Sequence, residues 1–440
     1  MKLKRELENL ECAIPVKWDE RLGPAVHWTA SQELPVHRWF RYREGFSPKL
    51  LTYFTTPKRI LDPFCGCGTT LVESSQRGIQ SFGIDLNPLA TFVTSAKTCA
   101  YSKADQKLFS QHAHFCATEY KHASCATRPM FPLLDKLFMP ESLEVLLRLK
   151  NLISQVHNKR VRHLLFLAWL DILEAASNVF KEGNGLKYRN KRRRPGQYET
   201  IPDDIWIPSY FGLDISHFVR NLWTAKCEEI ATDLSCGLYE PKVVPKIRTG
   251  SCLDPECLRF DSDVDMVLFS PPYANRFDYF EAFKMELWMG DFVQNGADMR
   301  ALRSKSMRNN LAASHRDDRR DYAEWDLLAP FLCLMDDEAS SVRMGIKPAL
   351  QGYFADMRTL LRELRTSLSR KAHVVIVVGN SAYAGTIIPT DILLAHLARE
   401  EHYRVEQVRI ARHLHVSSQQ RPRLRSLQEY MRESVIILSR

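Results

Sequence analysis

The stretch RILDPFCGCGTTL, residues 59–71, is the part of the sequence that best predicts the fold. It reads as a short apolar strand, a tight turn with two glycines, and a helix that two threonines can cap. Gly66 and Gly68 can adopt backbone angles that other residues avoid, and without side chains they let a ligand approach the main chain. This order of elements predicts a ligand site at the edge of an α/β sheet.

Two acidic residues define the expected ligand. Asp62 ends the first strand, where its carboxylate can meet an amine, and Asp85 ends the next strand within FGIDLNPLA, where it can bind ribose hydroxyls. The turn has neither the three glycines of a dinucleotide-binding loop nor the Gly-Lys-Ser/Thr of a Walker loop. It contains no lysine, and Asp62 would repel a phosphate. A cationic nucleoside without phosphate suits these charges, and S-adenosylmethionine is such a ligand.

Strand and helix patterns alternate along most of the chain, which predicts a parallel sheet covered by helices. Seven strands are expected, at 59–62, 81–85, 243–248, 265–269, 373–379, 403–409 and 434–438. Helices are expected from residue 69 onward and at 88–97, 348–369 and 389–400.

Two long segments interrupt this alternation. Residues 101–240 carry their own helical patterns, at 140–156 and 161–180, and residues 294–345 are polar and rich in arginine. Segments of this length inside a domain are usually functional. The expected organisation is a cofactor-binding half at 1–100, a mainly helical insertion at 101–240, and a catalytic half at 241–440 with an arginine-rich loop at about 294–345.

The composition indicates what kind of partner the protein binds and in which compartment it is found. The 440 residues have a formal net charge of +9 and a pI of about 8.9, which favours a polyanionic partner. The 11 cysteines include no Cys-x-x-Cys pair, which argues against a disulfide framework or a ribbon-type zinc site. The N-terminus lacks the apolar core of a signal peptide, and the apolar run at 163–176 is too short to span a membrane. We therefore expect a cytoplasmic, nucleoid-associated protein without a metal.

A second motif, SPPY at 270–273, follows the apolar run DMVLF. Consecutive prolines stiffen the turn and remove backbone donors, so the Ser270 hydroxyl and the Pro271 carbonyl remain as fixed acceptors. Tyr273 adds a ring on which a planar group can stack.

Both motifs resemble those of the amino-directed DNA methyltransferases. DPFCGCGTT is similar to the cofactor motif of that family, SPPY to the catalytic motif of its cytosine-N4 branch, and HRWFRYREGFSPKLL at 37–51 to the segment that helps to close over the cofactor. The resemblance covers roughly 30–100 and 243–440. It implies a seven-stranded class I, Rossmann-like methyltransferase sheet. It also implies direct methyl transfer to the amine of a base swung out of the duplex. Ring-carbon methylation normally needs a Pro-Cys nucleophile, which this sequence lacks.

The resemblance assigns roles to individual residues. Ser251 stands in IRTGSCLDP where the family often has an acid, and with Cys252 and Asp254 it is a candidate to address the adenine of the cofactor. Asn380 and Tyr279 are further candidates at the sheet edge, whereas Cys65 and Cys67 read as small filler residues. The expected catalytic residues are Ser270, Pro271, Pro272 and Tyr273. The expected cofactor residues are Asp62, Pro63, Phe64, Gly66, Gly68, Thr69, Thr70, Asp85, Asn87 and Ser251.

The insertion contains KYRNKRRR at 187–194, whose charge density suits contacts to a phosphate backbone. It is therefore the expected target-recognition region, with the loop at 294–345 as a second candidate to contact double-stranded DNA. The expected substrate-binding residues are Lys187, Arg189, Lys191, Arg192, Arg193, Arg194, Asn275 and Asp278.

Together these features predict a site-specific DNA methyltransferase that acts on cytosine N4. The resemblance implies a bacterial restriction-modification or phage-defence role, with a cognate restriction endonuclease as partner. Adenine-N6 methylation is the nearest alternative, followed by RNA guanine-N2 methylation and by a non-catalytic DNA-binding protein.

Overall fold

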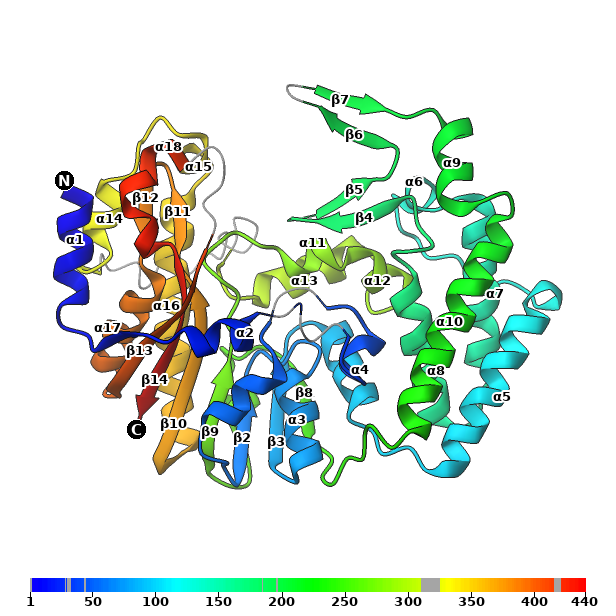
Figure 1. The fold of residues 1–440 in the computed structure, drawn as a ribbon, viewed down its shortest axis with the longest axis horizontal. Coiled ribbons are helices and arrows are strands. Elements are labelled where there is room, and N and C mark those ends of the chain that lie inside the picture. The colour runs from blue at the N-terminus through cyan, green and yellow to red at the C-terminus, as the bar shows by residue number, and fades with distance from the viewer. Residues whose placement is uncertain are drawn as a thin grey trace.

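The computed structural model describes residues 2–27, 29, 33–42, 45–183, 185–194, 197–309, 325–414 and 421–440. These residues form a mixed α/β fold around a large, mainly parallel sheet, as expected for a Rossmann-like methyltransferase (Figure 1). The strand order is β1-β13-β14-β10-β9-β2-β3-β8, and β14 runs antiparallel to both of its neighbours. The strands are β1 (Val16–Trp18), β2 (Arg59–Asp62), β3 (Gln80–Asp85), β8 (Lys246–Thr249), β9 (Val264–Phe269), β10 (Leu368–Gly379), β13 (Arg404–His413) and β14 (Arg432–Ser439).

Each of the seven predicted strands overlaps a strand of this sheet, but the predicted total of seven is wrong for the described residues because β1 adds an eighth. This edge strand has only three residues and pairs in parallel with β13, Val16 lying opposite Val408. The sequence does not predict β1 because three residues are too few to show an alternating apolar pattern. Its partner β13 also lies almost the whole length of the chain away in sequence.

Helices cover both faces of the sheet because its strands are apolar on both sides. Along β10, Val374, Ile376 and Val378 pack into one core, whereas Val375 and Val377 pack into another. The first core also contains side chains of α1 (Lys2–Glu11), α16 (Ile346–Ser367) and α17 (Thr390–Glu400). The second contains side chains of α2 (Gly23–Val26) and of the 3-10 helix η4 (Pro48–Tyr53). Helices α3 (Thr69–Arg77) and α4 (Pro88–Lys97) follow β2 and β3.

The helices of the insertion form a bundle on the right of Figure 1. Its helices are α5 (Lys103–Glu119), α6 (Leu134–Leu137), α7 (Pro140–Ser154), α8 (Lys159–Ile172), α9 (Asp203–Phe211) and α10 (Ile215–Ser235), with the 3-10 helix η5 (Tyr120–His122) after α5. Within the described ranges, no helix combines the length and the apolar character that crossing a bilayer requires.

The helix predicted at 161–180 is wrong in its second half. Helix α8 ends at Ile172, and the chain then forms two antiparallel strand pairs, β4 (Val179–Glu182) with β5 (Gly185–Tyr188) and β6 (Lys191–Arg194) with β7 (Gln197–Thr200). The β-branched Val179 and the aromatic Phe180 favour a strand, and both are apolar enough to continue a helical pattern in the sequence. We call β4–β7 the ribbon; in Figure 1 it projects above the helices formed by residues 279–305.

The segment at 294–345 is not one continuous loop. It contains α13 (Gly296–Lys305), α14 (Ala329–Cys333) and α15 (Ser340–Arg343), and residues 310–324, which include three of its seven arginines, lie outside the described residues. The remaining elements are α11 (Tyr279–Ala282), α12 (Lys284–Met289), β11 (Ser381–Tyr383), β12 (Thr386–Ile388), α18 (Arg421–Leu424), η1 (Glu20–Leu22), η3 (His37–Trp39), η6 (Pro255–Leu258) and η7 (Arg425–Tyr430).

Candidate active site

The two sequence motifs meet where the sheet changes direction. From β2 the chain builds outward through β3 to β8, then returns to the other side of β2 and continues through β9 to β10. The carboxyl ends of β2 and β9 are therefore adjacent, Leu61 lying opposite Val267, and this switch point is where α/β sheets bind ligands. The glycine turn after β2 and the SPPY turn after β9 both line one cavity there. It contains about 1010 Å³ of unoccupied space, including its open mouth.

The glycine turn has the backbone geometry that its sequence predicts. Gly66 and Gly68 have φ angles of 51° and 86°, in the left-handed region that favours glycine. A Cβ on Gly68 would lie 2.7 Å from the Thr94 side chain, and one on Gly66 would lie 3.2 Å from the Tyr42 ring. Both glycines are thus required by conformation and by close packing.

Two carboxylates hold the turn together, of which Asp62 is buried and Asp85 half-buried. Asp62 accepts hydrogen bonds from the Thr70 hydroxyl at 2.7 Å and from the Phe64 amide at 3.1 Å. Asp85 accepts from the amides of Gly66 at 2.9 Å and Asn87 at 2.8 Å. Burial raises the pKa of Asp62 to about 7 and that of Asp85 to about 6, although these hydrogen bonds act in the opposite direction.

Asn87 offers the cavity a buried donor. Its side-chain oxygen caps α4 by accepting from the Leu89 amide at 3.0 Å, and the residue is 3% exposed. Its Nδ2 has no hydrogen-bond partner within the described part of the chain. A buried donor without a partner is costly, so an acceptor on a bound ligand would stabilise this side chain.

The opposite wall of the cavity comes from segments distant in sequence. Tyr42 stacks on Phe283, with ring centroids 4.7 Å apart and planes 12° apart, and Phe46 lies beside it on the wall. This places Tyr42 and Phe46 of the 37–51 segment against the cavity. Ser251 donates its hydroxyl to the Lys305 carbonyl at 3.0 Å, which brings the end of α13 to the rim.

In the SPPY turn, Ser270 and Pro272 line the cavity, whereas Pro271 is buried behind them. Within the described residues, neither the Ser270 hydroxyl nor the Pro271 carbonyl takes part in a hydrogen bond. The backbone just after the turn is held in place, because the Tyr383 hydroxyl of β11 donates to the Ala274 carbonyl at 2.7 Å.

Tyr273 does not line this cavity. Its hydroxyl donates to Oε1 of Glu433 at 2.7 Å, and Oε2 of Glu433 accepts from Nε of Arg412 at 2.5 Å. The ring packs against Gly379, where an added Cβ would lie 3.0 Å from it. The position of Tyr273 is therefore fixed by the hydrogen bond of its hydroxyl and by the packing of its ring.

The structure brings ten of the predicted cofactor and catalytic residues to the cavity, namely Asp62, Pro63, Phe64, Gly66, Thr69, Asp85, Asn87, Ser251, Ser270 and Pro272. Gly68 and Thr70 shape the turn from behind. Cys65, Cys67, Cys252 and Tyr279 also line the cavity. Sequence reasoning missed Lys305, Ser306, Met307 and Asn309, since only the fold brings the end of α13 to the rim.

Four other polar candidates near the sheet edge have hydrogen-bond partners within the chain. Asp278 caps α11 and forms an ion pair with Arg303 at 3.1 Å. Asn380 is buried, donates to the Tyr430 carbonyl at 2.9 Å and accepts from the Asp391 amide at 3.0 Å. Asp254 caps η6. Asn275 is exposed, and its side chain accepts from the Phe277 amide at 3.1 Å.

The predicted phosphate contacts lie on the ribbon. Lys187, Lys191 and Arg192 are exposed, and we call these three the cationic ribbon residues. Arg189 is half-buried and donates to the carbonyls of Ser177 at 3.0 Å and Glu174 at 2.9 Å. Arg193 and Arg194 belong to β6, but their side chains are outside the described structure.

The chain was compared with protein-family models and with known proteins. No protein-family model matches the chain. The chain is 26% identical over 407 residues to the Type II methyltransferase M.AvaI of a Nostoc species, covering 87% of this chain and 82% of that protein. It is 25% identical over 420 residues to M.BsoBI of Geobacillus stearothermophilus (85% and 80% covered). It is 23% identical over 398 residues to M.MvaI of Kocuria varians (84% and 82%). Over most of its length, this chain is therefore similar to proteins named Type II methyltransferases.

Proposed function

We propose that the chain is a site-specific DNA methyltransferase that uses S-adenosylmethionine to methylate the N4 amine of a cytosine. The observation that carries this proposal is the meeting of the glycine turn and the SPPY turn in one cavity at the switch point of the sheet. The similarity to Type II methyltransferases supports DNA as the substrate and a restriction-modification role, with a cognate restriction endonuclease as partner.

The residues of the cavity fit a cationic nucleoside. Asp62, which is buried, and Asp85, which is half-buried, supply negative charge when ionised, and Asn87 supplies a donor that needs an acceptor. The glycine turn, which contains no lysine, leaves the main chain open to close contact. When bound, S-adenosylmethionine supplies an electrophilic methyl group. Asp62 suits the ligand's ammonium group and Asp85 its ribose hydroxyls.

The SPPY turn suits an amine that accepts this methyl group. An exocyclic amine is a poor nucleophile because its lone pair is delocalised into the ring. The Ser270 hydroxyl and the Pro271 carbonyl have no competing hydrogen bond within the described chain, so they can accept the amino hydrogens. The base must leave the duplex to reach this turn, and Tyr273 offers a ring whose position is already fixed.

The serine before Pro-Pro-Tyr favours cytosine N4 over adenine N6. Nucleoside analysis after transfer of a labelled methyl group to genomic DNA tests the proposal directly, and the expected product is N4-methylcytosine. N6-methyladenine would overturn the choice of base, and absence of any labelled nucleoside would overturn the proposed activity.

A matched pair of variants tests the role of the turn. Tyr273→Ala is expected to abolish methyl transfer while cofactor affinity largely survives, because Tyr273 does not line the cavity. Tyr53→Ala is the control, since Tyr53 is a 38% exposed tyrosine of η4 outside the cavity. Loss of transfer and cofactor affinity together in Tyr273→Ala would show that the ring is only structural.

A further inference from the structure

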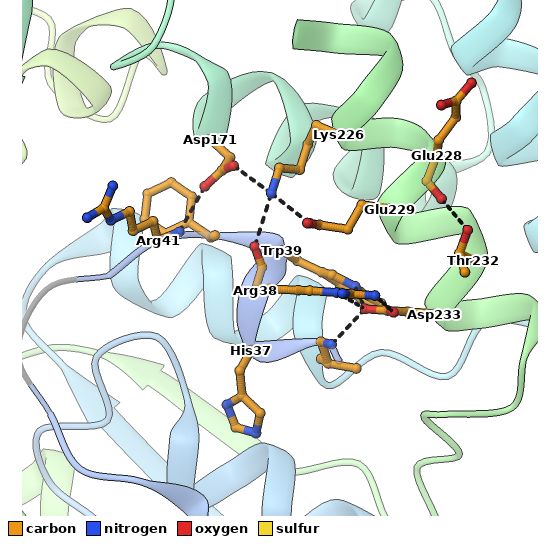
Figure 2. Close-up of polar contacts among 12 residues, drawn as sticks. His37, Arg38, Trp39, Arg41, Asp171, Lys226, Glu228, Glu229, Thr232 and Asp233 are labelled. Carbon is orange, nitrogen blue, oxygen red and sulfur yellow. Dashed lines mark hydrogen bonds and ion pairs between the residues drawn. The ribbon is translucent and has the colours of Figure 1, made fainter. Parts of the chain in front are cut away.

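The wall of the cavity that carries Tyr42 begins with a segment that has little structure of its own. Residues 36–42 contain one short 3-10 helix, η3, yet Tyr42 packs closely against the Gly66 turn. Such a segment needs partners elsewhere to hold one position. Those partners come from the insertion (Figure 2).

The main anchor is Asp233 of α10, which is completely buried. Its Oδ2 accepts from the Val36 amide at 3.0 Å and from the Trp39 indole at 2.8 Å. The Arg38 guanidinium donates to both carboxylate oxygens. One carboxylate thus fixes both the backbone and the side chains of the segment, as Figure 2 shows.

A second anchor lies about two helical turns earlier on α10. Lys226 forms ion pairs with Asp171 at 2.8 Å and Glu229 at 2.7 Å, and it donates to the Arg38 carbonyl at 3.1 Å. Asp171 of α8 in turn accepts from the Arg41 amide at 2.8 Å. Helices α8 and α10 therefore hold the main chain of the segment at both ends.

The segment is also packed from its other sides. Lys97 of α4 donates to the His37 carbonyl at 2.8 Å. Beyond Tyr42, the Phe283 ring is covered by the Lys181 ammonium of β4 at 4.2 Å, and Lys181 forms a buried ion pair with Glu286. Val36, Trp39 and the insertion helices belong to one continuous hydrophobic core. The insertion thus reaches the cavity wall by two separate routes.

A largely buried network of ion pairs and hydrogen bonds of this kind contributes little net stability but can specify a unique geometry. We propose that the insertion holds the cofactor wall in place, with Asp233 and Lys226 as positioning residues for cofactor binding. This inference rests on the proposed function, in which the cavity binds S-adenosylmethionine. It assigns the insertion a role in cofactor binding that is separate from contact with DNA.

Asp233→Asn tests this proposal, with Glu228→Gln as the matched control. The asparagine would replace one carboxylate oxygen by an NH₂ group, which cannot accept the hydrogen bonds that Val36, Arg38 and Trp39 donate to Asp233. Glu228 lies on the same helix, but its side chain is exposed, and within the described residues its carboxylate forms no hydrogen bond or ion pair; only its backbone carbonyl accepts from Thr232. Titration calorimetry is expected to show at least a tenfold weaker Kd for S-adenosylmethionine in Asp233→Asn and less than a twofold change in Glu228→Gln.

A second readout does not depend on cofactor binding. Cys65 and Cys67 line the cavity beside Tyr42, so loosening of the wall should speed alkylation of the peptide that contains both, measured by mass spectrometry. Alkylation of the exposed Cys125 should stay unchanged and serves as the internal reference. If the wild type fails to bind S-adenosylmethionine, the proposed function is wrong, and the alkylation rates still decide whether Asp233 holds the wall.

Trp39→Phe covers the case in which Asp233→Asn does not fold. It removes one donor to Asp233 and keeps an aromatic ring, so we expect a smaller loss of cofactor affinity with little change in Tm. The proposal is overturned if both variants match Glu228→Gln within twofold in Kd and in alkylation rate. A fall in Tm with unchanged affinity and alkylation would likewise overturn it, because that result describes a structural role alone.

Discussion

Affinity for S-adenosylmethionine should rise steeply between pH 5.5 and pH 8. In the ligand-free protein, burial raises the pKa of Asp62 to about 7 and that of Asp85 to about 6. A cationic ligand favours the ionised carboxylates, so binding should be weak where they are protonated and strong where they are not. For a pKa of about 7, the ionised fraction grows from about 3% to about 91% over this range, a gain of roughly 30-fold. Asp85 adds roughly another fourfold by the same reasoning.

Titration calorimetry at constant ionic strength measures this dependence, and repeating it in buffers of different ionisation enthalpy measures the protons released. Asp62→Asn is the control: it should bind more weakly at pH 8 and lose most of the pH dependence. The folded pKa values lie above the unfolded ones, so the free energy of unfolding of the ligand-free protein should fall as pH rises from about 4 to 7. A Kd that varies less than twofold over the range, or an equal slope in Asp62→Asn, would refute the reasoning.

Three other predictions concern different parts of the molecule. Glu433→Gln weakens the anchor of the Tyr273 hydroxyl, so methyl transfer should fall roughly tenfold with unchanged cofactor Kd; full activity would show that the anchor is dispensable. Lys181→Met leaves the buried Glu286 without its cation, so the free energy of unfolding measured in urea should fall by about 3–5 kcal/mol. Adding Glu286→Leu should restore much of that free energy, and no recovery would contradict the ion-pair explanation. Replacing all three cationic ribbon residues by alanine should weaken the salt dependence of binding to duplex DNA. The slope of log binding constant against log salt concentration should become shallower by about 0.9 for each phosphate contact that is lost. An unchanged slope would show that these three residues do not contact the DNA.

Local sequence predicted the centre of the molecule well because the decisive features there are local. The strand, glycine turn and helix at 59–71 lie within one short stretch, and β2 has the predicted bounds. Strand polarity then places Asp85 and Ser270 at the same edge without further information. The likeness of this region to a methyltransferase motif is supported by the similarity to Type II methyltransferases.

The features that sequence reasoning missed depend on long-range contacts. The pairing of Asp233 with the 36–39 segment spans nearly 200 residues, and Asp233 belongs to no motif. Arg189 reads as one more cation in a basic run, yet tertiary packing turns its guanidinium toward backbone carbonyls. The direction of Tyr273 depends on Glu433, a residue 160 positions later on another strand.

The core that the insertion shares with the rest of the chain limits which of its parts could be exchanged between related proteins. A chimaera that replaced all of 101–240 would also discard Asp233 and Lys226, and with them the anchors of the wall that carries Tyr42. The β6–β7 hairpin is a smaller unit, closed at its base by a hydrogen bond of 2.7 Å from the Ile201 amide to the Asn190 carbonyl. Grafting at that base leaves every anchor in place, which makes the hairpin the better unit for domain engineering.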